Sequence, residues 1–145
     1  MADVPNYVSR WQLKKDEKFR IRFNLDELEK EDGNFELHLT EKGGDSVEHW
    51  VEFRMWDYNA MINLRKKATK YHDASNTFYV DSDLFNEVKV IFLLKDWSFG
   101  HIDPHMKLSH FEGRLSDESI SAFKSLLPIV ANAIIYKMNE VLEGY

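Results

Sequence analysis

The sequence predicts a single α+β domain. A small antiparallel β-sheet of about three strands is packed by two middle helices and by a C-terminal helical hairpin or bent helix. Three observations support this class. Between residues 19 and 56, apolar and polar side chains alternate as they do in half-buried strands. From residue 57 onward, the apolar spacing changes to three and four residues, which is typical of helices. No repeat, low-complexity run or linker divides the 145 residues.

Three alternating segments make up the predicted sheet. The first begins at Phe19, and the second follows the turn signal at 32–34. The third covers 51–55 and follows the glycine turn at 43–45. Consecutive strands with short connections usually pair, so we expect a β-meander. The acidic run 26–32 between the first two strands is interpreted as a solvated loop.

Two middle helices follow the sheet. Asp57 is the expected cap of a helix that runs to about Tyr71. Residues 78–80 form either a short strand, which would be the fourth of the sheet, or the lead-in to the next helix. That helix is capped by Asp81 or Asp83 and gives way near residue 96.

The C-terminal third combines a loop and two helical stretches. Gly100 and Pro104 prevent helix continuation, so residues 100–114 are predicted to form a long polar loop. Ser116 is a strong helix cap, because two acidic residues occupy the first turn after it. Pro128 either kinks this helix or opens a new one, and the apolar pattern continues to Gly144.

Composition excludes several classes of protein. The chain has no cysteine, which removes disulfide frameworks, zinc ribbons, iron–sulfur clusters and thiol nucleophiles. Its net charge of −6 argues against a nucleic-acid module. The first residues do not have the pattern of a signal peptide, and no apolar run approaches the roughly 20 residues of a membrane span. We therefore expect a soluble intracellular protein with no membrane partner.

One basic cluster departs from this acidic balance. Arg65, Lys66 and Lys67 lie together near the end of the first predicted helix, with Lys70 close behind. Positive charge is favoured at the C-terminal end of a helix, so the residues are interpreted first as a solvated helix face. The alternative is a site for an anionic partner.

A second cluster offers metal-ligating side chains. His101, Asp103, His105 and His110 lie within ten residues of one another. His101 and His105 have the spacing of a helical zinc pair, but the glycine and proline of this segment exclude the helix that such a pair needs. A metal-dependent enzyme that uses this loop remains an alternative function. Elsewhere, the sequence contains no nucleophile elbow and no phosphate-binding loop, so we expect no catalysis and no cofactor.

Aromatic residues make up 14% of the chain, which is the unusual feature of its composition. Such residues dominate cores and interfaces. Trp11 lies in an N-terminal arm, residues 1–18, that precedes the domain at 19–145. The predicted partner-binding residues are Trp11, Trp50, Trp56, Trp97, Phe99, Arg65, Lys66 and Lys67.

Three segments, read in order, resemble tail morphogenesis proteins of tailed bacteriophages, particularly their small tail assembly chaperones. The first is a tryptophan-bearing strand followed by a basic helix, residues 50–69. The second is the helix ending at 94–99, and the third is the acid-capped helix, proline and closing apolar helix at 115–142. The loop at 101–110 departs from the turn that follows the tryptophan in that family, and the N-terminal strands have no counterpart.

The resemblance implies a non-enzymatic protein that acts through protein–protein contacts during tail assembly. Its partners would be other phage tail proteins, either the tape-measure protein or tail and baseplate subunits, and a homo-oligomer is left open. The alternative within this class is a structural virion component of the neck, tail or baseplate. The implied location is accordingly the host cytoplasm during assembly, or the virion.

Overall fold

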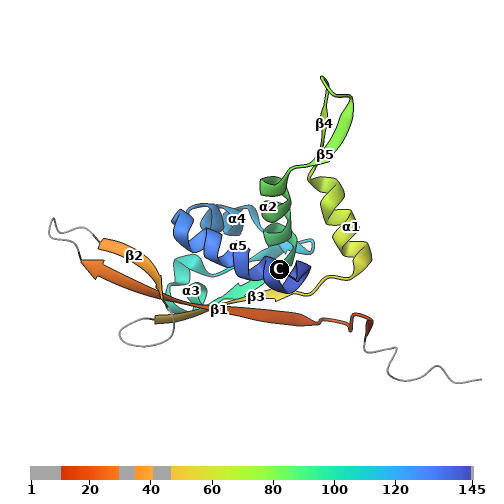
Figure 1. The fold of residues 1–145 in the computed structure, drawn as a ribbon. Helices are drawn as coiled ribbons and strands as arrows, with labels where there is room; N and C mark the ends of the chain where they lie inside the picture. Colours follow the sequence, from red (N-terminus) through yellow and green to blue (C-terminus); the bar gives the residue numbers. More distant parts are fainter. Residues whose placement is uncertain (1–10, 30–34, 41–46, 145) are drawn as a thin grey trace, which may run out of the picture.

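The computed structural model describes residues 11–29, 35–40 and 47–144, which form an α+β fold as the sequence predicts (Figure 1). The strands are β1 (Lys18–Glu29), β2 (Phe35–Thr40), β3 (Val47–Arg54), β4 (Thr69–His72), β5 (Thr77–Val80), β6 (Leu94–Trp97), β7 (His110–Phe111) and β8 (Arg114–Leu115). The helices are α1 (Tyr58–Lys67), α2 (Ser82–Leu93), α3 (Ser98–Ile102), the 3-10 helix η2 (Pro104–Met106), α4 (Asp117–Lys124) and α5 (Pro128–Glu143). Residues 1–10 of the predicted arm and the predicted turns at 32–34 and 43–45 lie outside the described residues.

The main sheet is antiparallel and has the strand order β2-β1-β3-β6. The predicted meander is therefore wrong, because the central strand β1 pairs with both β2 and β3. The length of β1 allows this. Its first part, from Lys18 to Leu25, pairs with β3, and its last part, from Asn24 to Glu29, pairs with β2. Part of the acidic run predicted as a solvated loop thus belongs to a strand.

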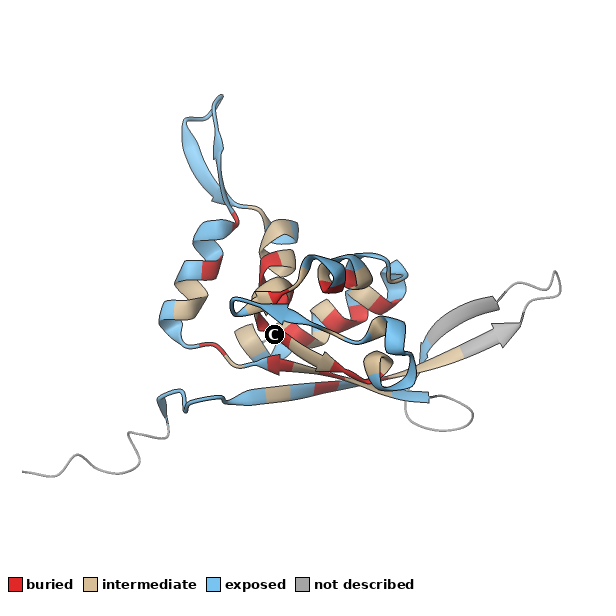
Figure 2. Ribbon diagram, turned by 180° about the vertical axis from the view of Figure 1, so that it is seen from behind, coloured by how far each residue is buried: buried red, intermediate tan, exposed pale blue. Residues whose placement is uncertain are grey.

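Helices cover one face of this sheet (Figures 1 and 2). The apolar residues of β1 and β3 that alternate toward this face are buried; they are Ile21, Phe23, Val51 and Phe53. Their neighbours in the core come mainly from α2, β6 and α5. The opposite face carries the charged residues of both strands, as alternation in a strand dictates.

The fourth strand of the sheet is β6, which the sequence analysis did not predict. The expected helix ends at Leu93, and the backbone becomes extended at Leu94 so that β6 pairs with β3. Gly100 does not end a helix either, because it lies inside the short helix α3. The predicted polar loop at 100–114 contains the end of α3, η2 and the small β7–β8 hairpin.

The C-terminal helices follow the sequence prediction closely. The Ser116 hydroxyl accepts a hydrogen bond from the backbone N–H of Ser119 and so caps α4. Pro128 opens a new helix rather than kinking the old one, and α4 and α5 meet at 110°. Among the described residues, no single helix is long and apolar enough to span a membrane; α4 and α5 meet that test only as a bent pair.

A buried lysine joins α2 to the end of α5. Lys89 is 1% exposed, and its Nζ donates to Asn139 Oδ1 at 2.7 Å and lies 3.1 Å from Glu143 Oε1. The ammonium group also lies 4.2 Å from the centroid of the Phe85 ring. Burial lowers the pKa of Lys89, and the hydrogen bond to Glu143 opposes that shift.

Candidate protein-binding surfaces

A β-hairpin projects from the body of the protein between α1 and α2 (Figure 1). It consists of β4 and β5, and every residue of both strands is exposed (Figure 2). The predicted helix to Tyr71 is therefore wrong in its last turn, since α1 ends at Lys67 and the chain turns into β4. The segment 78–80 is a strand, but it pairs with β4 and not with the main sheet.

The hairpin is amphipathic. The register pairs Tyr71 with Phe78 and Thr69 with Val80, so that these four residues share one face. Phe78 is 75% exposed, and its ring lies 5.1 Å from that of Tyr71. An isolated two-stranded hairpin is at best marginally stable in water, and it normally packs an apolar face against something. This apolar face has no such cover among the described residues.

The base of the hairpin is held firmly to the body. The backbone N–H of Asp81 donates to the carbonyl of Ala68 at 2.9 Å, which closes the two ends of the hairpin against each other. The Asp81 carboxylate caps α2 and pairs with Lys70 Nζ at 2.8 Å. That pairing raises the pKa of Lys70 and lowers the pKa of Asp81. The hairpin is therefore presented in a defined direction.

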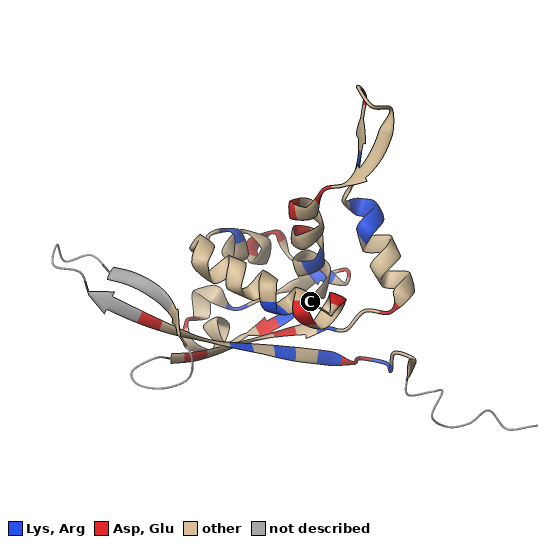
Figure 3. Ribbon diagram, in the orientation of Figure 1, with Lys and Arg blue, Asp and Glu red and all other residues tan. Residues whose placement is uncertain are grey.

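The predicted basic cluster lies at the foot of this hairpin. Arg65, Lys66 and Lys67 form the last turn of α1 and are exposed (Figure 3). Lys67 Nζ lies 5.2 Å from the centroid of the Phe92 ring. Lys70 is not part of that helix, contrary to the prediction. A positive region thus borders an almost uncharged projection.

A groove of 630 Å³ lies at another end of the molecule, where α3 and the α4–α5 junction meet β1 and the start of β3. We call it the α3–α5 groove. Its rim includes three exposed apolar residues: Val47 at 54%, Ile102 at 69% and Leu127 at 57%. Its acidic lining residues are Asp26 and Asp103, and the described lining contains no lysine or arginine.

One wall of the groove is formed by Phe99 and His49. The two rings lie 4.8 Å apart, and His49 Nδ1 is 3.0 Å from Ser98 Oγ. Burial lowers the pKa of His49, which favours its neutral form. The predicted binding residue Phe99 therefore lies in an apolar wall that carries no positive charge around neutral pH.

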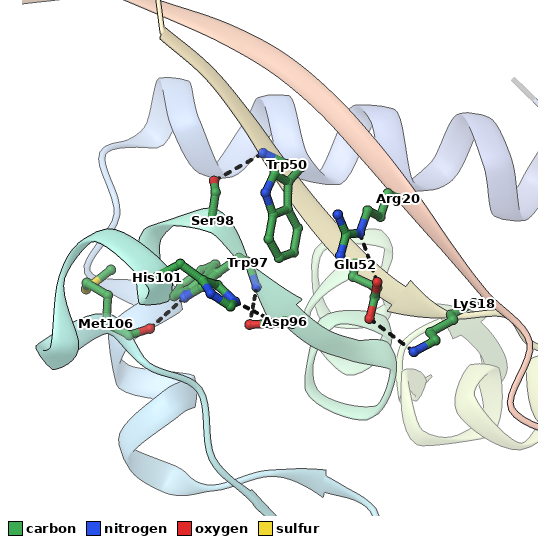
Figure 4. Close-up of polar contacts among 9 residues, drawn as sticks. All are labelled: Lys18, Arg20, Trp50, Glu52, Asp96, Trp97, Ser98, His101 and Met106. Carbon is green, nitrogen blue, oxygen red and sulfur yellow. Dashed lines mark hydrogen bonds and ion pairs between the residues drawn. The ribbon is translucent and has the colours of Figure 1, made fainter.

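Trp50 lies on the helix-free face of the sheet (Figure 4). The guanidinium of Arg20 stacks 3.9 Å from the centroid of its ring, and the His101 ring lies 5.3 Å away. Arg20 and Lys18 both reach Glu52, at 2.9 and 3.6 Å. Trp50 is half-buried by these contacts, so it offers a partner only a part of its surface.

The remaining predicted tryptophans divide between core and exterior. Trp97 is fully buried, and its Nε1 donates to the Met106 carbonyl at 2.6 Å. Trp56 is 8% exposed and donates to the Leu142 carbonyl at 3.3 Å. Both residues are part of the core, and their prediction as partner-contacting side chains is corrected. Trp56 leaves the strand pattern because β3 ends at Arg54, whereas Trp11 is 78% exposed.

The histidine cluster is dispersed by its own hydrogen bonds. His101 Nε2 lies 2.8 Å from Asp96 Oδ2, while Asp103 accepts from the backbone of His105. His110 Nε2 lies 2.9 Å from the carbonyl of Leu94. Among residues 11–29, 35–40 and 47–144, no group of three potential ligands is placed to hold a metal ion.

The β4–β5 hairpin was not predicted, although the sequence contains a signal for it. Residues 69–72 and 77–80 are rich in threonine and aromatic residues, and the mostly polar segment 73–76 separates them. Asn76 adopts a positive φ of 53° in that turn, a conformation that asparagine tolerates. The helical spacing of Ala68 and Tyr71 concealed this pattern.

The chain was compared with models of protein families, with curated proteins and with solved structures, and none of them matches it.

Proposed function

We propose that this protein is not an enzyme but an assembly protein that works through protein–protein contacts, using the apolar face of the β4–β5 hairpin. The observation that carries this proposal is the exposure of Tyr71, Phe78 and Val80 together on one face of a firmly anchored projection. Exposed apolar groups arranged on one face mark interaction surfaces more often than scattered single residues do.

The proposed setting is the assembly of a bacteriophage tail, on the basis of the sequence resemblance described above. The chain would act there as a tail assembly chaperone or, in the alternative form, as a structural component of the neck, tail or baseplate. The proposed partners are other tail proteins, and the proposed location is the host cytoplasm during assembly or the virion. The two forms differ in one respect, because a component remains in the finished particle and a chaperone leaves it.

The test uses a virus or prophage that encodes this chain. We expect that deleting the gene leaves particles without normal tails under the electron microscope, and that Phe78→Ser has the same effect. Phe111→Ser is the matched control, because Phe111 is 68% exposed in the separate β7–β8 hairpin. Mass spectrometry of purified particles then separates the two forms by the presence or absence of the chain. Normal tails after deletion would overturn the proposal.

A further inference from the structure

The α3–α5 groove and the β4–β5 hairpin are complementary in polarity, size and charge. From these features we infer that the groove of one copy of this protein receives the hairpin of a second copy, so that copies associate head to tail. The inference rests on the proposed function, in which the hairpin is a binding element, and it names the hairpin's partner.

Polarity is the first point of agreement. The hairpin face with Tyr71, Phe78 and Val80 carries no charge, and its one lysine, Lys70, lies on the other face and is paired with Asp81. The groove rim is formed by apolar side chains that are themselves more than half exposed. Neither apolar surface has a cover among residues 11–29, 35–40 and 47–144, and each covers the other if two copies meet.

Size is the second point. A groove of 630 Å³ falls within the roughly 300–1,000 Å³ of sites that enclose a drug-sized ligand. The adjacent rings of Tyr71 and Phe78, 5.1 Å apart, form a compact group on that scale. The hairpin also projects from the body of the protein (Figure 1), which is a shape that a concave site can receive.

Charge is the third point, and it favours a second copy over an arbitrary apolar partner. The charged lining residues of the groove, Asp26 and Asp103, are acidic. The residues at the foot of the hairpin, Arg65, Lys66 and Lys67, are basic (Figure 3). Insertion of the hairpin would bring the basic foot toward the side of the molecule that carries these two acidic lining residues, and such complementarity fixes the orientation of a complex.

The arrangement in the molecule makes the contact intermolecular. The hairpin projects beside α1, whereas α3 and the start of β3 lie at the other end of the sheet in both ribbon views (Figures 1 and 2). A hairpin therefore cannot reach the groove of its own chain. The two contacting surfaces differ, so the association is heterologous and produces rings or open chains.

The contact is expected to be weak between two copies. The exposed parts of Tyr71 and Phe78 amount to about 250 Å², well below the roughly 800 Å² that each partner buries in a standard interface. Association should consequently depend on concentration, and also on salt, because charged residues lie on both sides of the contact.

The experiment is sedimentation velocity of the purified full chain from about 10 µM to about 1 mM. We expect the mean sedimentation coefficient to rise with concentration. Phe78→Ser removes the hairpin's main apolar group, and Ile102→Asp places a charge on the groove rim. Each is expected to weaken association at least tenfold, whereas the control Phe111→Ser leaves it unchanged. These three residues are exposed, and circular dichroism checks that each variant keeps the fold.

A mixture of the two variants gives the decisive result. Phe78→Ser retains an intact groove, and Ile102→Asp retains an intact hairpin, so an equimolar mixture can form one contact and should produce a dimer that neither variant forms alone. A wild-type chain that is monomeric throughout would overturn the inference. So would association through hairpins alone, in which Ile102→Asp has no effect and adding Phe78→Ser to it forms no additional dimer. Normal tail assembly after gene deletion would instead refute the proposed function and leave this measurement intact.

Discussion

The buried ion pair between Lys89 and Glu143 allows a quantitative test of how α5 is held. The side chain of Lys89 is 2% exposed and that of Glu143 is 17% exposed. Without its partner, the Lys89 ammonium would have almost no access to water, whereas the Glu143 carboxylate would keep some. Replacing Glu143 by Met leaves the Lys89 ammonium buried away from water, with the neutral Asn139 side chain as its hydrogen-bond acceptor. Loss of a buried partner of this kind costs about 3 kcal/mol of the free energy of unfolding.

Replacing Lys89 by Met should cost much less. Methionine keeps most of the stem volume against Phe85 and Trp56, and the remaining carboxylate of Glu143 is within reach of water. Because burial lowers the pKa of Lys89, its positive charge is less favourable in this setting than in water. We expect Lys89→Met to change stability by about 1 kcal/mol or less, since replacing a buried charge by an apolar group is often close to neutral.

The assay is urea denaturation of both single variants and the double variant, followed by circular dichroism. The double variant should be more stable than Glu143→Met alone, because it removes the ammonium that the first substitution leaves unpaired. Lys124→Met is the matched control: the Lys124–Glu87 pair is 55% and 38% exposed, and its loss should cost under about 1 kcal/mol. Equal losses of stability in the two single variants, or losses that simply add in the double variant, would contradict this prediction.

Two further predictions concern the wall and the support of the α3–α5 groove. Burial lowers the pKa of His49 in the folded protein, so the imidazole binds a proton more tightly in the unfolded chain. The contribution of neutral His49 to the free energy of unfolding is therefore complete above the unfolded pKa of 6.5 and is lost as the pH falls through the folded pKa. His49→Gln should lack that acid-side loss, which urea midpoints at about pH 7.5 and about pH 5.5 would reveal, and an unchanged pH dependence would contradict it. In Gly100→Ala, the added Cβ would lie 3.0 Å from both Lys107 Cα and the Met106 carbonyl, so we expect a loss of about 1–3 kcal/mol in thermal denaturation. A variant as stable as the parent would show that the backbone at Met106 and Lys107 shifts to accommodate the added methyl group.

The helices that carry their own start signals could be predicted from the sequence. Asp57, Asp81 and Ser116 each cap the helix expected of them, with hydrogen bonds to the backbone three residues on. Such caps are local interactions, so the sequence near them contains all the information needed. Pro128 at the first position of α5 is a signal of the same kind.

The pairing of strands could not be predicted in the same way. Leu94 ends an apolar run that fits the preceding helix, and only the place of Leu94–Trp97 beside Val51 and Phe53 makes this segment a strand. The central position of β1 likewise depends on two partners that lie on opposite sides of it. These outcomes are decided by tertiary contacts, which override local propensity.

The candidate surfaces were only partly predictable for the same reason. The exposed basic turn at the end of α1 could be identified because Arg65, Lys66 and Lys67 are consecutive and no apolar residue lies between them. Trp97 could not be assigned, since an aromatic residue at the end of an expected helix is equally compatible with a core or a contact role. Its burial depends on Phe99 and Phe123, which pack against its ring at 5.3 and 6.4 Å.

The hydrogen bond from the Asp81 N–H to the carbonyl of Ala68 joins the two ends of the hairpin segment. It already completes the connection between α1 and α2, so residues 69–80 form an insertion in an otherwise finished link. We expect that shortening or lengthening this segment leaves the packing of the core unchanged. The part of the molecule that would choose a partner is thus structurally separable from the part that folds.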